Sequence, residues 1–254
     1  MKKRANKFFV LLFSVVCVVI CVLLANLLSS AITVSESGAN AQTTTFSGYS
    51  VYAISLGAYT SKSSAESNCE EIMKKGGAGY VFKEDNVYHV LASAYEKEND
   101  AKLVQENLTE SGISSTILKI SIGEVSLAEV SSSSQKKSFL NSLAILKNCY
   151  LNLYDISVSL DTNSIDETKA KIKLIEEKST LEKQIENLSK GNSAIDGIYY
   201  QTIKNTYLEI ENQLTLLKEY ENINGISLSA KIKHEYINVL EKLDDLVKSL
   251  NNEF

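Results

Sequence analysis

The sequence predicts an α+β protein: a small domain with a four-stranded antiparallel sheet in the order β-α-β-β-α-β, followed by an all-α antiparallel helical bundle. Three observations support this prediction. A strand-helix pattern occurs twice between residues 49 and 122, a serine-rich stretch follows it, and the hydrophobic period becomes helical from residue 135 onward. A chain of 254 residues with 44% hydrophobic content is long enough for two modest domains.

The first part of the chain has the features of a membrane anchor. Residues 1–7 form a basic tail, and an uncharged apolar run covers residues 8–28. A helix of this length, at 1.5 Å per residue, crosses a hydrocarbon core of about 30 Å. Because basic residues stay on the cytoplasmic side, we expect a single-pass protein of the cell membrane, with a cytoplasmic N-terminus and most of the chain outside.

A cleaved signal peptide is the alternative for this segment. Ala39-Asn40-Ala41 offers a cleavage site of small residues, but the apolar run is longer than the usual signal-peptide core and lies about ten residues from that site. We therefore expect an uncleaved anchor. Residues 33–48 contain almost no large apolar side chain and predict a linker.

The repeated pattern defines the first folded domain, residues 49–122. Ile54–Tyr59 (ISLGAY) and Val90–Tyr95 (VLASAY) are related by an offset of 36 residues. Each segment alternates like a strand and is followed by a polar run and an amphipathic helix. The helices are expected to stop at Gly76-Gly77 and at Gly112, and each leads into a further strand.

This domain resembles the SPOR domain, the sporulation-related repeat of bacterial envelope proteins. The family pattern is an aromatic residue, a strand with glutamine and glycine, and a small-aromatic pair, echoed in a second half. Residues 52–59 match the first half and residues 88–95 the second, while Ser55 stands in place of the glutamine and Ser93 in place of a second glycine. The resemblance covers roughly 70 residues and implies a noncatalytic module that binds peptidoglycan glycan strands stripped of their stem peptides.

Strand parity predicts which side chains are available for binding. Ile54 and Leu56 should face the two helices, as should Val90 and Ala92, so their neighbours should face the open side of the sheet. By resemblance, the glycan is expected to lie along that open face. The candidate glycan-binding residues are Ser55, His89, Leu91, Ser93, Tyr80 and Phe82. Tyr59 and Tyr95 are expected to pack at the strand-helix corners.

The remainder of the chain predicts a helical bundle. Residues 123–134 end in four serines and indicate a second linker, and residues 135–254 contain four segments with helical hydrophobic period. Short turns at Gly191-Asn192 and Asn224-Gly225 favour an antiparallel arrangement. An extended coiled coil or a dimer remains an alternative, since one sequence does not show whether a hydrophobic seam closes within its own chain.

Charge argues against a nucleic-acid partner. The chain carries a net charge of −5, and without the four basic residues of the first 32 positions, 22 basic residues face 31 acidic ones, a net charge of −9. The order β-α-β-β-α-β is RNP-like, because RNA-binding domains share it, but the acidic balance and the absence of an Arg/Lys-Gly-aromatic strand oppose that function.

We expect no enzyme, no cofactor and no metal. A zinc site needs three protein ligands, and the two histidines, His89 and His234, belong to different predicted domains. Acidic residues interleaved with lysines, as in residues 241–245, are expected to form solvated helix faces.

The sequence therefore predicts a membrane-anchored peptidoglycan-binding protein of the bacterial envelope, acting in cell division or sporulation. The helical bundle would contact an unknown protein partner. The alternative is an envelope scaffold that works by protein-protein contacts through the bundle.

Overall fold

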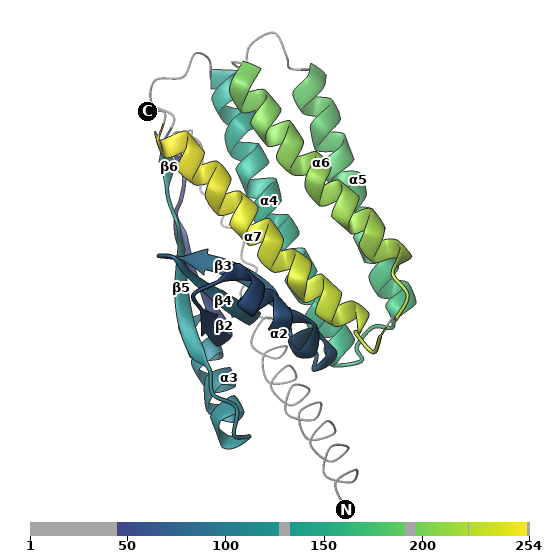
Figure 1. Ribbon diagram of the computed structural model, residues 1–254. Coiled ribbons are helices and arrows are strands. Elements are labelled where there is room, and N and C mark those ends of the chain that lie inside the picture. Colours follow the sequence, from purple (N-terminus) through teal and green to yellow (C-terminus); the bar gives the residue numbers. More distant parts are fainter. Residues whose placement is uncertain (1–44, 127–132, 191–196, 223, 253–254) are drawn as a thin grey trace, which may run out of the picture.

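The computed structural model describes residues 45–126, 133–190, 197–222 and 224–252 (Figure 1). No placement is given for residues 1–44, so the predicted basic tail, the predicted membrane anchor and most of the first predicted linker lie outside the described residues.

The repeat domain, residues 49–122, has the predicted β-α-β-β-α-β order. Its four strands form one antiparallel sheet in the order β3-β4-β2-β5, with the two copies of the repeat in the central strands β2 and β4. The elements are β2 (Tyr49–Tyr59), α2 (Lys62–Lys74), β3 (Tyr80–Glu84), β4 (Val87–Tyr95), α3 (Glu98–Glu110) and β5 (Thr116–Ile122).

Local sequence signals account for the ends of these elements. The side chain of Ser61 caps α2 by accepting a hydrogen bond from the backbone N–H of Ser64 at 3.3 Å. The helix ends at a glycine, Gly76, whose φ of 90° few other residues adopt. Asp85 and Asn86, with φ of 43° and 65°, form the two-residue turn between β3 and β4.

A short ribbon flanks the repeat domain. Strand β1 (Thr45–Phe46) pairs antiparallel with β6 (Val125–Ser126), and Phe46 and Val125 are buried. These strands lie within residues 33–48 and 123–134, the two ranges that the sequence predicts as linkers. The chain therefore enters and leaves the repeat domain side by side.

Four long helices form the C-terminal bundle, as predicted. They are α4 (Ser133–Asp161), α5 (Glu167–Lys190), α6 (Gly197–Glu219) and α7 (Leu228–Asn252). Helix α4 packs chiefly on α7, and α5 packs chiefly on α6. The interior contains mostly leucine, isoleucine and tyrosine side chains at helical spacing, such as Leu143, Tyr207 and Leu243.

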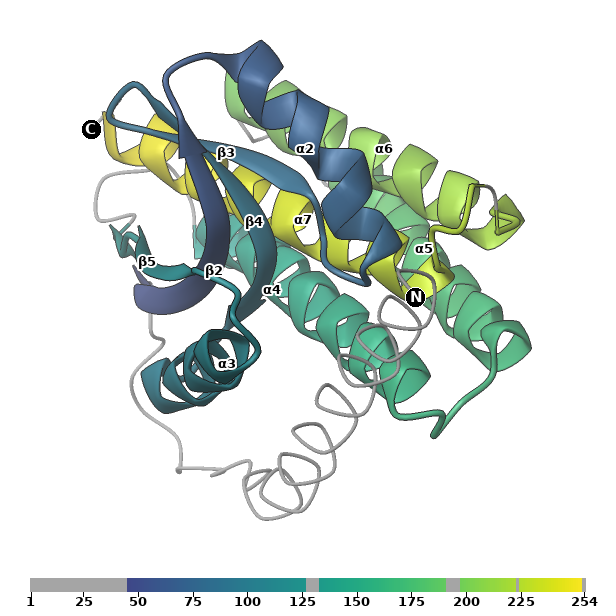
Figure 2. The same ribbon diagram turned by 60° about the horizontal axis from the view of Figure 1, so that its bottom comes forward.

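The bundle packs directly against the sheet. Helices α2 and α3 cover one face of the sheet, and α7 with α4 crosses the opposite face (Figures 1 and 2). Val51, Leu91 and Ile120 from the strands belong to the same hydrophobic cluster as Leu143 and Leu243 from the bundle. The repeat domain and the bundle thus share one continuous core.

Candidate functional site

The bundle covers the sheet face on which the sequence places the glycan. Four of the six candidate residues are buried against it: Ser55 is 2% exposed, Leu91 0%, Tyr80 8% and Phe82 8%. His89 is partly exposed, and its Nδ1 lies 3.4 Å from the Ser55 hydroxyl, which donates to the carbonyl oxygen of Gly57 at 2.9 Å. The structure therefore brings these five residues onto one face, but that face is closed.

Ser93 lies on the other side of the sheet, contrary to the parity prediction. Ser55 pairs with Leu91, whereas the preceding residue, Ile54, pairs with Ser93, so Ala92 is an extra residue in β4. Such a β-bulge reverses the alternation of side chains beyond it. Ser93 consequently faces the α2/α3 side together with Ile54, and it lines a cavity there.

Polar groups on α7 complete the contact with the sheet. The Tyr80 hydroxyl donates to the Glu241 carboxylate, and the Tyr236 hydroxyl accepts a hydrogen bond from the backbone N–H of Ala94 at 3.0 Å. The His234 Nδ1 lies 3.0 Å from the carbonyl oxygen of Ala78. Burial, followed by the neighbouring Glu241 carboxylate, raises the pKa of Tyr80, so the phenol stays protonated and donates.

These contacts correct the expectation that residues 241–245 form a solvated face. Glu241 contacts the sheet through Tyr80, and Asp244 is only 3% exposed. Burial also raises the pKa of Glu241 and of Asp245. Glu241 is thus part of the interface with the repeat domain, whereas Asp245 is exposed and Lys242 forms an ion pair with Glu209 of α6.

Uncovering the sheet face would be costly. Burial of one large apolar side chain contributes roughly 1.5–3 kcal/mol, so five such residues contribute on the order of 10 kcal/mol. The residues concerned are Val51, Phe82, Leu91, Ile120 and Ile122. A ligand with a Kd of about 1 μM supplies roughly 8 kcal/mol. A glycan of ordinary affinity does not offset the separation of α7 from the sheet.

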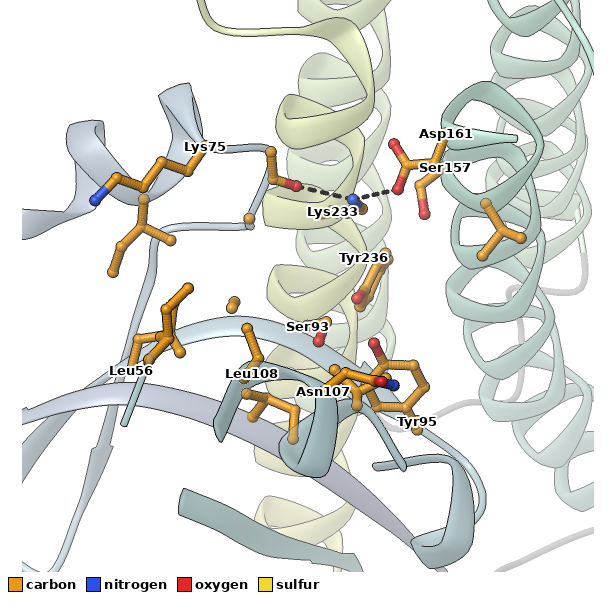
Figure 3. A pocket seen from close by; sticks show the side chains of 18 of the residues that line it. Leu56, Lys75, Ser93, Tyr95, Asn107, Leu108, Ser157, Asp161, Lys233 and Tyr236 are labelled. Carbon is orange, nitrogen blue, oxygen red and sulfur yellow. Dashed lines mark hydrogen bonds and ion pairs between the residues drawn. The ribbon is translucent and has the colours of Figure 1, made fainter. Parts of the chain in front are cut away.

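A cavity of about 280 Å³ lies on the opposite side of the sheet. We call it the α2/α3 groove, because residues of β2, β4, α2 and α3 line most of it, and residues of α4 and α7 close one end. Figure 3 shows Leu56 and Asn107 of the repeat domain and Asp161 and Lys233 of the bundle around this space. Strand β3 pairs with β4 only as far as Leu91. Beyond Leu91 no strand among the described residues covers that edge of β4, and there the groove reaches the bundle.

The lining of the groove repeats with the 36-residue offset of the sequence. The two β-bulges fall at Leu56-Gly57 in β2 and at Ala92 in β4, which are equivalent positions. Six equivalent pairs line the groove: Leu56 with Ala92, Tyr59 with Tyr95, Asn68 with Val104, Glu71 with Asn107, Ile72 with Leu108, and Gly77 with Ile113. The groove therefore lies between the two repeats, near the approximate twofold axis that relates β2-α2 to β4-α3.

Charges in the groove are paired. Lys233 of α7 donates to the carbonyl oxygen of Gly76 at 2.8 Å and forms an ion pair with Asp161 of α4 (Figure 3). At the α2 side, Lys75 and Glu71 form an ion pair at 2.7 Å. Two lysines and two carboxylates thus balance one another among the lining residues.

Sequence reasoning missed most residues of the groove. Of the predicted binding residues only Ser93 lines it, while Tyr59 and Tyr95, expected as corner residues, also contribute. Tyr95 does pack edge-to-face on Tyr154 of α4, with ring centroids 6.2 Å apart. The 36-residue offset between the repeats could have indicated these residues. Applied to the two helices, it pairs Glu71 with Asn107 and Ile72 with Leu108.

The fold is that of an α+β module, built from two strand-helix repeats and fused to a four-helix bundle. Residues 48–119 match the SPOR domain family, so this part of the chain is a SPOR domain. The predicted resemblance is thereby confirmed, and the family implies peptidoglycan binding rather than catalysis. Neither the curated proteins nor the solved structures contain a match to this chain.

Two further observations concern the described residues alone. None of their helices combines the length and apolar character needed to cross a membrane. Within the same residues, no three histidine, cysteine or acidic side chains gather where they would hold a metal ion.

Proposed function

We propose that this protein is a membrane-anchored peptidoglycan-binding protein of the bacterial envelope, which recognises denuded glycan strands at septal or sporulation wall sites. The observation that carries the proposal is the SPOR match over residues 48–119. The apolar run of residues 8–28, preceded by a basic tail, supports the anchor and an outward-facing domain. The acidic balance of the chain favours a partner other than a nucleic acid.

Co-sedimentation with cell-wall sacculi tests this function. The full chain, purified in detergent, is mixed with isolated sacculi before and after an amidase has removed the stem peptides. We expect more protein in the pellet after amidase treatment, because the glycan is then uncovered. Sacculi digested with a muramidase, which cuts the glycan itself, serve as the control and should release the protein. An equal absence of protein from both pellets would contradict the proposal.

A second candidate is an envelope scaffold that acts through protein contacts of the bundle. The observation that favours it is the burial of the sheet face in the core of the bundle. On α5 and α6, which lie away from the sheet in Figure 1, the exposed large apolar side chains include Ile172, Ile175, Leu208 and Leu216.

Crosslinking in cells distinguishes the scaffold from the glycan reader. A photoreactive residue at position 172 should capture a partner protein if the bundle is a scaffold, and an Ile175→Asp substitution should abolish this adduct. The same substitution should leave sedimentation with sacculi unchanged. A lack of adducts at positions 172 and 216 would argue against the scaffold.

A further inference from the structure

We infer that the α2/α3 groove, rather than the sheet face, is the glycan-binding site of this protein. The inference rests on the proposed function and names the surface that performs it. The sheet face is closed by α7, whereas the groove is an existing cavity of about 280 Å³. A site in the groove requires no separation of the bundle from the sheet.

The lining of the groove has the chemistry that a sugar strand needs. Leu56, Ala92 and Ile72 give an apolar surface for the carbon face of a sugar ring and for the methyl groups of its acetamido substituents. Hydroxyl and amide groups of Ser93 and Asn107 face the same space and can exchange hydrogen bonds with sugar hydroxyls (Figure 3).

Two tyrosines of the repeat domain contribute aromatic surface to the groove. Tyr59 and Tyr95 occupy equivalent positions in the two repeats and line the groove together. Tyrosine presents an apolar ring face and a polar hydroxyl, which is the combination that sugars contact. The groove therefore offers these two tyrosine side chains to a sugar ligand.

Charge complementarity favours a ligand without phosphate groups. Lys233 is held by Asp161 and by the carbonyl oxygen of Gly76, and Lys75 is held by Glu71. Neither lysine is presented as an unpaired cation, so the groove does not offer the excess positive charge that phosphates require. A denuded glycan strand contains no phosphate group, and amidase cleavage leaves one lactyl carboxylate on each N-acetylmuramic acid.

Methyl NMR of the unmodified protein locates the ligand directly. The full chain in detergent micelles, labelled at Ile, Leu and Val methyl groups, is titrated with a peptide-free tetrasaccharide of alternating N-acetylglucosamine and N-acetylmuramic acid. We expect shifts for Leu56, Ile72 and Val104, which line the groove, and none for Val51 and Leu91 on the covered face. Shifts confined to Val51 and Leu91 would overturn the inference.

A pair of substitutions on α3 provides the second test. Asn107→Trp places a bulky ring in the groove, whereas Glu106→Trp adds the same ring at an exposed neighbouring position that does not line it. We expect Asn107→Trp to weaken sedimentation with amidase-treated sacculi at least tenfold and Glu106→Trp to leave it unchanged. The sequence contains no tryptophan, so the emission wavelength of each variant reports whether its indole is shielded from water.

The outcomes separate the site from the function. If the unmodified protein sediments with sacculi and Asn107→Trp, with a shielded indole, does so equally well, the groove is not the site, although the function stands. If the unmodified protein does not sediment with any sacculi, the proposed function fails, and the inference fails with it.

Discussion

At the scale of single residues, the contact between bundle and sheet depends on a cluster of tyrosines. Tyr236 of α7 packs edge-to-face on Tyr150 and Tyr154 of α4, with ring centroids 5.8 Å apart in both pairs. The two buried hydroxyls differ in their bonding. Tyr236 accepts the Ala94 N–H, whereas the Tyr150 hydroxyl has no hydrogen-bond partner among the described residues.

This difference makes Tyr236→Phe and Tyr150→Phe a matched pair. Tyr236→Phe leaves the buried N–H of Ala94 without a partner, which should lower the free energy of unfolding by about 1–3 kcal/mol. Tyr150→Phe removes an unpaired buried hydroxyl and should be neutral or stabilising. Urea unfolding followed by circular dichroism measures both. Equal losses of stability in the two variants would show that the hydrogen bond from Ala94 contributes nothing specific to the free energy of unfolding.

Glu235 should make the stability of the protein depend on pH. It is buried on α7, and burial raises its pKa to about 8, although Asn238 donates a hydrogen bond to it and Lys242 lies near. Its pKa in the unfolded chain is about 4.5. Between these values the folded state holds a proton that the unfolded state has lost, so the contribution to stability is full below pH 4.5 and falls as pH rises toward 8.

Glu235→Gln tests this linkage, because glutamine keeps the shape and does not titrate. The unmodified protein should lose up to about 1 kcal/mol of stability per pH unit relative to the variant between pH 5 and 8. Urea unfolding of both proteins at four pH values in this range gives the comparison. If the free energies of unfolding of the two proteins change with pH in parallel, Glu235 has an ordinary pKa in the folded protein.

At the scale of elements, the connection from α2 to β3 depends on two glycines for different reasons. Gly76 and Gly79 both have positive φ, 90° and 55°. A Cβ at Gly76 would meet no atom within 4 Å, but a Cβ at Gly79 would lie 2.4 Å from the carbonyl oxygen of Cys69. The first position requires glycine for its backbone conformation alone, and the second also for space.

Alanine substitutions should separate the two requirements. Gly76→Ala should cost about 1–2 kcal/mol from backbone strain, and Gly112→Ala, at the equivalent end of α3 with φ of 75° and free space, should cost the same. Gly79→Ala should cost at least twice as much. Thermal melting provides the measurement, with Gly112→Ala as the control. Similar melting temperatures for all three variants would contradict the steric argument.

The sequence predicted the types of the helices and strands better than any other feature of the structure. The alternation around Leu56 and Tyr95 and the helical period from residue 135 onward are local signals, and both indicated the right element types. The extra residue at Ala92 was not predictable, because a bulge is visible only when two strands are paired. Ser93 was therefore assigned to the wrong face.

The covering of the sheet by α7 could not be predicted for a different reason. Residues 241–245 were expected to form a solvated helix face, and His234, Asn238 and Glu241 are all polar. In the structure, Asn238 and Glu241 contact Tyr80, and His234 contacts both Tyr80 and the backbone of Ala78. Polar residues that satisfy one another across an interface cannot be distinguished, in sequence, from polar residues that face water.

At the scale of the whole molecule, the shared core makes the two halves depend on each other. Residues 45–126 alone would expose Val51, Leu91 and Ile120 to water. We expect this fragment to aggregate when it is produced by itself. Co-expression with residues 127–254 should restore a soluble complex, because the sheet face is then covered again. Size-exclusion chromatography of the two preparations measures the difference.

A soluble, monomeric and folded fragment 45–126 would contradict this dependence. Leu91→Asp in the co-expressed fragment provides the control, since it should prevent the complex from forming. Glu106→Trp, on the exposed side of α3, should not.

Helix α7 also determines how force would travel through this protein. Its C-terminal part contacts the stretch beside the β1-β6 ribbon, where Val247 and Asn251 lie against Gly123. Its N-terminal part contributes Lys233 and Tyr236 to the groove. Along the helix axis these places are roughly 20 Å apart, at 1.5 Å per residue. With a membrane anchor before β1 and a glycan in the groove, as proposed, tension between membrane and wall would pass lengthwise along α7 as well as along β2, which also joins these two places.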